Sequence, residues 1–264
     1  MCGRYVVVQK WEELEKAFHT IPTAVTTPYV ANYNIGPGSY APVVILENGV
    51  PKMINMQFGL TPFWASKKMY LFNARSEGDG NEHDDVHYTG GKGIISKPAF
   101  RKPIREQRCL VIANAFMEGP KTEKLSKPYL CYLRDRELFC MAGIYDSYTD
   151  NTTGEVTQSF AIITTVANEL MQKIGHHRSP VILDQQDEML WLTGTDLSAI
   201  TQLLKPYPAA AMNAYPIDAA IKNQKNNAPE FLTPIGKPLM IETEQVMVSE
   251  EYLWNKNKRI LRKE

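Results

Sequence analysis

The sequence predicts a single α+β domain built around a strongly curved, barrel-like β-sheet and flanked by short helices. Runs rich in β-branched and aromatic residues recur along the 264-residue chain, separated by Gly, Pro and Asn, which is the usual signature of strands. Helical stretches are fewer. The strands do not alternate regularly with long helices, which argues against a doubly wound parallel sheet. A chain of this length can bury a sizeable core.

The expected strands follow one another along most of the chain. They are Tyr5–Val8, Pro42–Leu46, Lys52–Phe58, Arg108–Ala113, Tyr129–Leu133, Leu138–Ile144, Ser159–Thr165 and Val181–Leu183. The expected helices are Trp11–Phe18, Asn168–Ile174, Gln185–Trp191 and Asp196–Leu204. The first of these carries Glu12 and Glu13 in its opening turn, as helices favour. The stretch Arg75–Glu77 is expected to enter a helix or a loop.

Two polar segments are expected to lie outside the core. The stretch Gly78–Gly93 is rich in Gly and Asp, which predicts a long flexible loop. Its histidines, His83 and His87, suggest metal binding, but a mobile surface loop is the preferred interpretation. The tail from Asn223 onward is polar and ends in a basic stretch, which predicts a frayed terminus.

Composition excludes several classes of protein. The chain is 44% hydrophobic and 22% charged, which is ordinary for a soluble globular protein. It has no apolar run near 18 residues and no basic segment followed by an apolar one, so neither a membrane span nor a signal peptide is expected. The cytoplasm is therefore the default location, and no membrane partner is expected.

Net charge and cysteine spacing argue against further classes of protein and of binding site. A formal net charge of zero argues against a whole-surface DNA binder, although the basic segment from Lys92 to Arg108 leaves room for a local groove or a solvated loop. The cysteines form no C-x-x-C pair, so no zinc site, other metal or cofactor is expected. Three of them lie in apolar, strand-like runs and are expected to be small buried residues: Cys109, Cys131 and Cys140.

Cys2 is the most informative residue in the chain. It follows the initiator methionine, which is normally removed before a small residue, and removal would leave an α-amine and a thiol on one Cα. Such an aminothiol can trap an aldehyde as a Schiff base that closes to a thiazolidine, or act as an N-terminal nucleophile. Reference pKa values of about 7.7–8.0 for the amine and about 8.5 for the thiol leave both reactive near neutral pH.

Motifs in a fixed order identify a family resemblance. The matching segments are Met1–Arg4, Tyr33–Pro37, Ala41–Val44, Phe58–Ala65, Asn73–Glu77, Arg108–Val111, Phe116–Glu118, Lys127–Tyr129, Phe139–Gly143, Phe160–Asn168, His176–Leu183 and Ala228–Glu230. Together they resemble the SOS-response-associated peptidase (SRAP) family, also known as abasic-site processing proteins. The resemblance covers roughly residues 1–235, which predicts an SRAP domain there and a C-terminal extension over 236–264.

The resemblance implies a function. Members of the family fold as one α+β domain around a curved, barrel-like mixed sheet. They remove Met1 autocatalytically, bind single-stranded DNA and trap abasic sites through the N-terminal Cys as a stable thiazolidine crosslink that shields the lesion. A minor lyase activity is also implied. The expected partner is single-stranded DNA with abasic sites, and a monomer is expected.

The resemblance also assigns roles to particular residues. Cys2 supplies the amine and thiol, and Asn73 positions the substrate, although an Asn-capped helix start is the alternative for Asn73. Glu118 is the acid/base group, with a structural salt bridge as the alternative. His176, rather than its neighbour His177, is the catalytic histidine, suited to move protons near neutral pH.

Contacts with DNA are expected from basic and aromatic side chains. Arg75 is expected to grip a phosphate, with a solvated arginine as the alternative. Phe63 and Trp64, following Pro62, are expected to form an apolar wedge that stacks on a base, with core packing as the alternative. The remaining candidates for backbone contacts are Arg4, Lys97, Arg101 and Arg178.

The chain departs from the family pattern at several positions. Met117 and Gly119 replace the usual aromatic residues around Glu118, so this strand is expected to pack or aim differently. Phe58 replaces a usual Trp, which is expected to alter one stacking ring. Ser179 replaces a usual Met. These changes affect expected DNA affinity more than the Cys2 chemistry.

Two other functions stay open from the sequence. Cys2 is also compatible with an N-terminal-nucleophile hydrolase acting on a peptide or amide, which would turn over a small amide and form no DNA adduct. A non-catalytic nucleic-acid binder is the third, and the net charge of zero weighs against it.

Overall fold

Strands of the larger sheet close into a β-barrel. The computed structural model describes residues 2–22 and 29–241. The barrel strands, in pairing order, are β10 (Val156–Val166), β4 (Val50–Phe58), β3 (Tyr40–Glu47), β6 (Arg108–Ala113) and β9 (Phe139–Thr149). β9 pairs again with β10, which closes the barrel. β10 runs parallel to β4 whereas the other neighbours are antiparallel, so the expected mixed, barrel-like sheet of a single α+β domain is confirmed.

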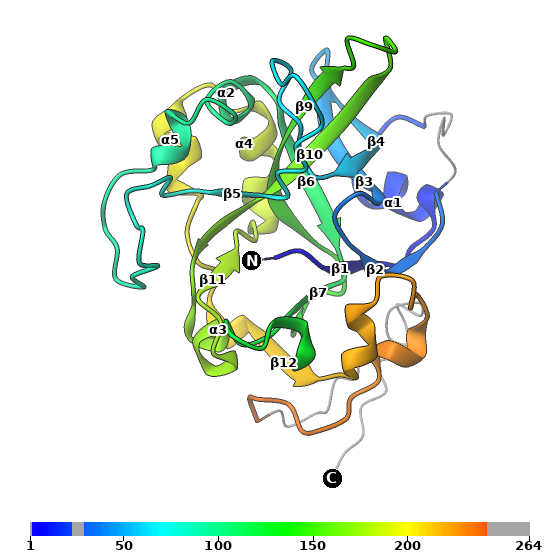
Figure 1. The fold of residues 1–264 in the computed structure, drawn as a ribbon, viewed down its shortest axis with the longest axis vertical. Helices are drawn as coiled ribbons and strands as arrows, with labels where there is room; N and C mark the ends of the chain where they lie inside the picture. Colours follow the sequence, from blue (N-terminus) through cyan, green and yellow to red (C-terminus); the bar gives the residue numbers. More distant parts are fainter. Residues whose placement is uncertain (1, 23–28, 242–264) are drawn as a thin grey trace.

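A second sheet lies beside the barrel, in the lower half of the molecule (Figure 1). Its strands, in pairing order, are β12 (Met212–Pro216), β8 (Tyr129–Leu133), β7 (Ala115–Glu118), β1 (Tyr5–Val7) and β2 (Asn32–Ile35). Only Asn114 separates β6 of the barrel from β7 of this sheet. Its side chain accepts a hydrogen bond from the Val8 amide at 3.0 Å and donates to the Glu137 carbonyl at 2.8 Å. Asn114 therefore fixes the point at which the chain passes between sheets.

β10 gathers segments that are distant in the sequence. Beyond its pairing with β4 it runs parallel to β5 (Asn73–Arg75) and antiparallel to β11 (Arg178–Pro180). The prediction that Arg75–Glu77 enters a helix or loop is therefore wrong at Arg75, because this residue pairs with Thr164 as the last residue of a strand. The pairing places the Asn73 segment and the Arg178 segment on opposite edges of the same strand.

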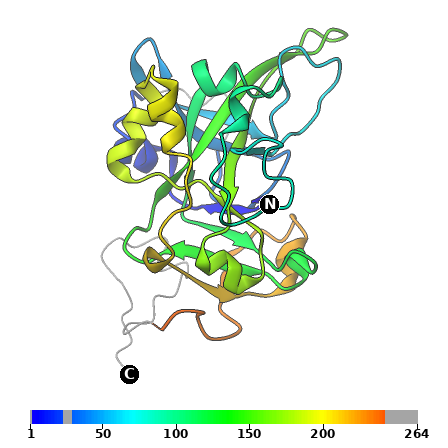
Figure 2. The ribbon, with the colours of Figure 1, turned by 90° about the vertical axis from the view of Figure 1, so that its left-hand side faces the viewer.

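Short helices flank the sheets, as expected (Figure 2). The α-helices are α1 (Trp11–Ala17), α2 (Pro103–Glu106), α3 (Glu169–Ile174), α4 (Glu188–Thr193) and α5 (Leu197–Gln202). The 3₁₀ turns are η1 (Gly93–Ile95), η2 (Lys124–Ser126), η3 (Gln185–Asp187), η4 (Ala209–Ala211), η5 (Ala219–Lys222) and η6 (Pro229–Leu232). Among residues 2–22 and 29–241, no helix is long and apolar enough to span a membrane.

The barrel core is rich in aromatic residues. Phe58 is fully buried, stacked on Phe160 at 5.2 Å between ring centroids, with Tyr5 and Phe72 edge-on at 5.6 and 6.3 Å. Such pairs stabilise a core beyond the area they bury. The expectation that Phe58 replaces a base-stacking ring is wrong, because its ring has no face open to DNA.

Several boundaries differ from those expected. The run Val181–Leu183 is not a strand. The strand β11 lies directly before it, and within the run Ile182 makes only an isolated bridge. The sequence reasoning missed β2, β7 and β12, which are short.

The tail from Asn223 is not frayed through residue 241. Leu232 is 1% exposed, and the Leu239 amide donates to the Ala214 carbonyl on β12 at 2.8 Å. The first residues of the predicted extension 236–264 thus lie along β12, whereas its basic end lies outside the described residues. The division at residue 235 stays a prediction.

Arg108 ties two helices to the barrel. Its buried guanidinium donates to the carbonyls of Trp191 and Gly194 at the end of α4, both at 2.5 Å, and to Ile104 of α2 at 2.9 Å. Arginine presents five N–H donors in a fixed fork, so one side chain can satisfy several helix-end carbonyls. Its role is structural, although it belongs to the basic segment singled out above.

Replacing Arg108 is expected to weaken the fold. Arg108→Met leaves the helix-end carbonyls without donors and should lower the free energy of unfolding by about 3 kcal/mol. Urea denaturation measures the change, and Arg101→Met, at an exposed arginine, is the matched control. Equal midpoints for the two variants would contradict this role.

Candidate functional site

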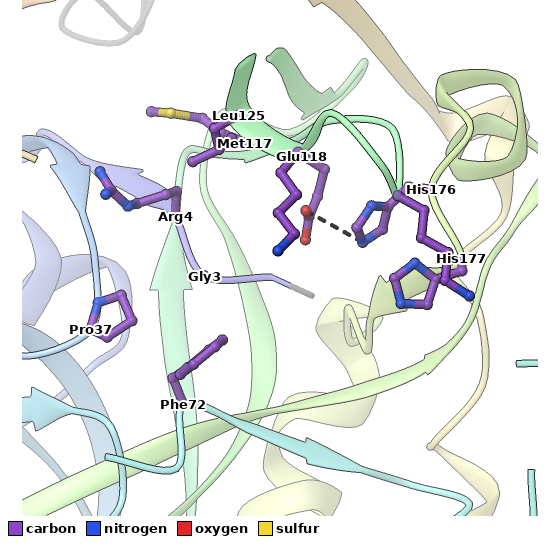
Figure 3. Close-up of a pocket in the computed structure, with 11 residues that line it drawn as sticks. Gly3, Arg4, Pro37, Phe72, Met117, Glu118, Leu125, His176 and His177 are labelled. Atoms are coloured by element: carbon purple, nitrogen blue, oxygen red, sulfur yellow. Dashed lines mark ion pairs between the residues drawn. The ribbon is translucent and has the colours of Figure 1, made fainter. Parts of the chain in front are cut away.

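The register of β1 against β7 builds one wall of the site. Tyr5 pairs with Phe116, and the Met117 amide donates to the Arg4 carbonyl at 2.9 Å. Continuing this antiparallel register places Glu118 beside Gly3, one residue from Cys2. Glu118 and Gly3 both line a cavity of about 510 Å³ (Figure 3).

Cys2 precedes Gly3, which lines this cavity, and is itself 1% exposed. Its carbonyl accepts a hydrogen bond from Asn73 Nδ2 at 2.9 Å, which ties the N-terminal segment to β5. Asn73 Oδ1 is buried and has no hydrogen-bond partner among the described residues. Burial, and then the nearby Glu118 carboxylate, raise the pKa of the Cys2 thiol, so the neutral thiol is the resting form.

Glu118 and His176 form a pair at the cavity. His176 Nε2 lies 3.4 Å from Glu118 Oε2 (Figure 3). His176 is positioned by the end of α3, where Gly175 adopts a left-handed conformation with φ of 80°. The His176 amide then donates to the Met171 carbonyl at 2.8 Å, which completes a Schellman motif. Both side chains are nearly buried, with 4% and 7% exposure for His176 and Glu118.

The hydrogen bond on the other ring nitrogen fixes the tautomer of His176. Nδ1 lies 2.7 Å from the Gly119 carbonyl, which can only accept, so Nδ1 carries the proton. Burial lowers the pKa of His176 to about 3, so the ring is neutral and its unprotonated Nε2 faces Glu118. Burial also raises the pKa of Glu118 to about 7. A carboxyl that holds its proton near neutrality thus faces an unprotonated imidazole nitrogen, which is an acid and a base in contact.

Gly119 is required by packing next to this pair. A Cβ on Gly119 would lie 1.9 Å from the Lys124 carbonyl oxygen and 2.8 Å from that of Lys127. The turn around η2 therefore packs directly on the Gly119 backbone. The strand was expected to aim differently at Gly119. The absent side chain instead allows the η2 turn to approach the strand backbone closely, and Glu118 still reaches His176.

The remaining cavity wall is mostly apolar and partly basic. Its other lining residues are Arg4, Pro37, Phe72, Met117, Lys121, Lys124, Leu125 and His177. The sequence reasoning missed Lys121 and Lys124 as site residues, since neither belongs to a matched motif. The available signal for a place in the site was that these lysines follow Glu118 by only three and six residues. The turn that brings them back is set by the packing on Gly119.

Arg75 and Arg178 share one acidic cluster. Arg178 is 2% exposed and donates to Glu77 Oε2 at 2.8 Å and to the Thr164 carbonyl at 2.9 Å. Asp84 Oδ1 lies 2.8 Å from Arg75 Nη2 and 3.4 Å from Arg178 Nη1. The sequence reasoning gave no role to the two carboxylates, although Glu77 lies within a matched motif. In this arrangement Arg178 faces protein carboxylates and not solvent.

Other predicted DNA contacts lie apart from this cluster. Arg4 lines the cavity, and its guanidinium donates to Asn34 Oδ1 at 2.7 Å and to the Lys222 carbonyl at 3.0 Å. Phe63 and Trp64 are 54% and 50% exposed on the turn after β4. They do not belong to the core, but the Lys102 ammonium lies over the Phe63 ring at 4.9 Å from its centroid.

The basic residues of the segment before β6 make different contacts. Lys97 pairs with Asp79, and Arg101 is exposed. Lys92 donates to the Leu204 carbonyl at 2.7 Å, so it holds the fold together. His83 and His87 belong to no metal-binding arrangement among the described residues, where no group of three or more His, Cys, Asp or Glu is suitably placed.

Known proteins resemble this chain over most of its length. A family model described as SOS response associated peptidase (SRAP) matches residues 1–224. Abasic site processing protein YoqW of Bacillus subtilis (strain 168) is 30% identical over 238 residues, covering 88% of this chain and 99% of that protein. Abasic site processing protein HMCES of Gallus gallus is 26% identical over 239 residues, covering 78% of this chain and 67% of that protein.

Solved structures share the fold. A protein from Bacteroides thetaiotaomicron superposes with a TM-score of 0.74 at 29% identity, covering 87% of this chain and 98% of that one. A protein from Bordetella bronchiseptica gives a TM-score of 0.64 at 22% identity, covering 82% and 100%, and shows likeness of fold alone.

Adding a methyl group at Gly119 is expected to destabilise the protein. Gly119→Ala forces the η2 turn away from the strand and should lower the free energy of unfolding by about 2–3 kcal/mol. Chemical denaturation measures the loss. Gly91→Ala is the control, because a Cβ there meets nothing within 4 Å. Wild-type stability of Gly119→Ala would show that the turn does not pack as described.

Stability is expected to depend on the Glu118 proton. The folded state keeps this proton up to a pKa of about 7, whereas the unfolded state releases it near its ordinary value, so the stabilisation is complete at low pH and lost as pH rises to about 7. Glu118→Gln cannot titrate. Its stability relative to wild type should therefore rise by about 2–3 kcal/mol between pH 4.5 and 7.5.

Urea unfolding at both pH values measures that difference. Glu82→Gln, at an exposed position, is the control and should run parallel to wild type. His176 acts in the opposite sense, since its depressed pKa costs stability as pH falls below about 6.5, and it is present in every variant compared. If the difference in unfolding free energy between Glu118→Gln and wild type were the same at both pH values, the raised pKa of Glu118 would be contradicted.

Proposed function

Because the chain belongs to the SOS response associated peptidase (SRAP) family, we propose that it processes abasic sites in DNA through Cys2. Relatives that it matches over 88% and 78% of its length carry the name abasic site processing protein. The observation that carries the proposal is the strand register that brings the Cys2 segment beside the Glu118–His176 pair, at the edge of a cavity. The substrate is single-stranded DNA whose ring-opened abasic sugar presents an aldehyde.

The proposed reaction begins with hydrolysis of the Met1–Cys2 amide, which frees the α-amine of Cys2. This amine adds to the aldehyde carbon, and loss of water gives a Schiff base. The Cys2 thiol then adds to the same carbon and its proton passes to the nitrogen, closing a thiazolidine. The first step consumes one water and releases free methionine, thiazolidine formation releases one water, and the protein becomes covalently joined to the DNA.

Glu118 and His176 are suited to move the protons of these steps. The protonated carboxyl of Glu118 can protonate the departing hydroxyl of the carbinolamine, while Nε2 of His176 accepts the proton that the nitrogen loses. The buried thiol needs such help, because burial raises the pKa of Cys2 and disfavours the thiolate. A Schiff base left open permits loss of the C2′ proton and β-elimination, which accounts for a minor lyase activity.

Other side chains hold the substrate. Asn73 fixes the Cys2 carbonyl and keeps one buried acceptor unused, so it can also receive a hydrogen bond from the sugar. The exposed rings of Phe63 and Trp64 provide a surface on which a base can stack. Arg4, which lines the cavity, would contact a flanking phosphate.

The proposal is tested with an oligonucleotide carrying one abasic site. Wild type should give a heat-stable shifted band on a denaturing gel, and Cys2→Ala should give none. Cys2→Ala still has an α-amine once Met1 is removed, so borohydride should trap its Schiff base as a band. Cys140→Ala, which removes a buried thiol elsewhere, should crosslink like wild type.

Mass spectrometry of the intact proteins establishes whether Met1 has been removed in each sample. No band from a wild-type protein that begins at Cys2 would exclude the proposal. Turnover of a small amide by that protein, lost in Cys2→Ala, would instead support the N-terminal-nucleophile hydrolase.

A further inference from the structure

We propose that Asp84 is an internal competitor of DNA: in the absence of DNA its carboxylate occupies the place between Arg75 and Arg178 where a backbone phosphate would bind, and DNA binding displaces it. The identity of the ligand rests on the function proposed above. Asp84 belongs to the loop between β5 and α2, which the sequence marks only as a flexible segment (Figure 1).

The Asp84 carboxylate lies where a bound anion would lie. One oxygen, Oδ1, is 2.8 Å from Arg75 Nη2 and 3.4 Å from Arg178 Nη1, and the other, Oδ2, is 3.7 Å from His177 Nε2. Arg75 is the last residue of β5, Arg178 is the first residue of β11, and His177 directly precedes β11. Planar guanidinium groups of this kind are the usual ligands of both carboxylates and phosphates.

The cluster offers more donors than Asp84 uses. The Nε atoms of Arg75 and Arg178 and Nδ1 of His177 are buried and have no hydrogen-bond partner among the described residues. Burying polar groups without partners costs free energy. A phosphate has more acceptor oxygens than a carboxylate and can engage more of these groups after the side chains adjust.

Charge balance favours exchange over addition. The two arginines face two carboxylates, those of Glu77 and Asp84. A phosphodiester carries one negative charge, so replacing Asp84 preserves the balance, whereas adding a phosphate beside Asp84 would set three negative charges against two positive ones. Like charges at such distances repel strongly in a buried site.

Asp84 is the carboxylate that can leave. Glu77 is 1% exposed and accepts a hydrogen bond from Thr165 Oγ1 at 3.1 Å, besides its pair with Arg178. Burial alone would raise the pKa of Glu77, but the Arg178 charge and hydrogen bond outweigh it and lower the pKa. Asp84, by contrast, has a φ of 56°, a left-handed conformation that is uncommon for non-glycine residues although Asp tolerates it better than most. Release of its side chain permits that backbone to relax.

The site adjoins the reaction centre. His177 lines the same cavity as Glu118, and its ring centroid lies 4.8 Å from that of His176. A phosphate held by Arg75 and Arg178 would therefore flank a sugar placed in the cavity. Asp84 would then act as an internal competitor that weakens binding of DNA lacking a reactive sugar.

The test compares Asp84→Asn with Glu82→Gln, which removes the same charge from an exposed position of the same loop. Fluorescence anisotropy with an undamaged single-stranded oligonucleotide should show about tenfold tighter binding for Asp84→Asn, because a competing charge in a partly buried site is gone, and a change within about twofold for Glu82→Gln. Inorganic phosphate should raise the melting temperature of Asp84→Asn more than that of wild type or Glu82→Gln.

Asp84→Ser provides a second variant if Asp84→Asn does not fold, with circular dichroism as the check. Equal behaviour of the folded Asp84 variant and Glu82→Gln in both assays would overturn the inference, even where wild type crosslinks abasic DNA. A phosphate response confined to the Asp84 variant, in a protein that forms no crosslink, would support the anion site but overturn both its assignment to DNA and the proposed function.

Discussion

The antiparallel register of β1 against β7 is the constraint on which the site depends. It places Glu118 beside Gly3 and so next to Cys2, although more than a hundred residues separate the two segments. A shift by one residue would turn the Glu118 side chain to the opposite face of the sheet. The register is secured on one side by the buried Tyr5 and Phe116 and on the other by Asn73, which holds the Cys2 carbonyl.

The acid–base pair depends on backbone geometry as much as on its own side chains. The Gly119 carbonyl fixes the His176 tautomer, and the absent side chain of Gly119 lets the η2 turn cover the strand. Burial then acts in opposite senses on the two groups, since it disfavours the charged form of each. Glu118 retains a proton up to about pH 7 and His176 remains neutral, which gives a donor facing an acceptor below that pH.

The arginine cluster shows how the same fold balances charge beside this pair. Arg178 lies among Glu77, Asp84 and the Thr164 carbonyl, so its charge is compensated inside the protein. A buried cation needs such partners, and its removal or exposure would leave carboxylates unpaired. The groups that compensate Arg178 and Arg75 are the carboxylates of Glu77 and Asp84.

The sequence by itself determined the α+β class and most of the barrel strands, because strand-forming runs are local. It also predicted Cys2, Glu118 and His176 as site residues, because each lies within an ordered motif. Short β5, β7 and β11 carry too little local signal, since their pairing with β10 or β1 decides their structure. Only the tertiary structure placed Phe58 in the core and Asp84 between two arginines. Those outcomes depend on contacts between distant segments, and no local pattern encodes which segments will meet.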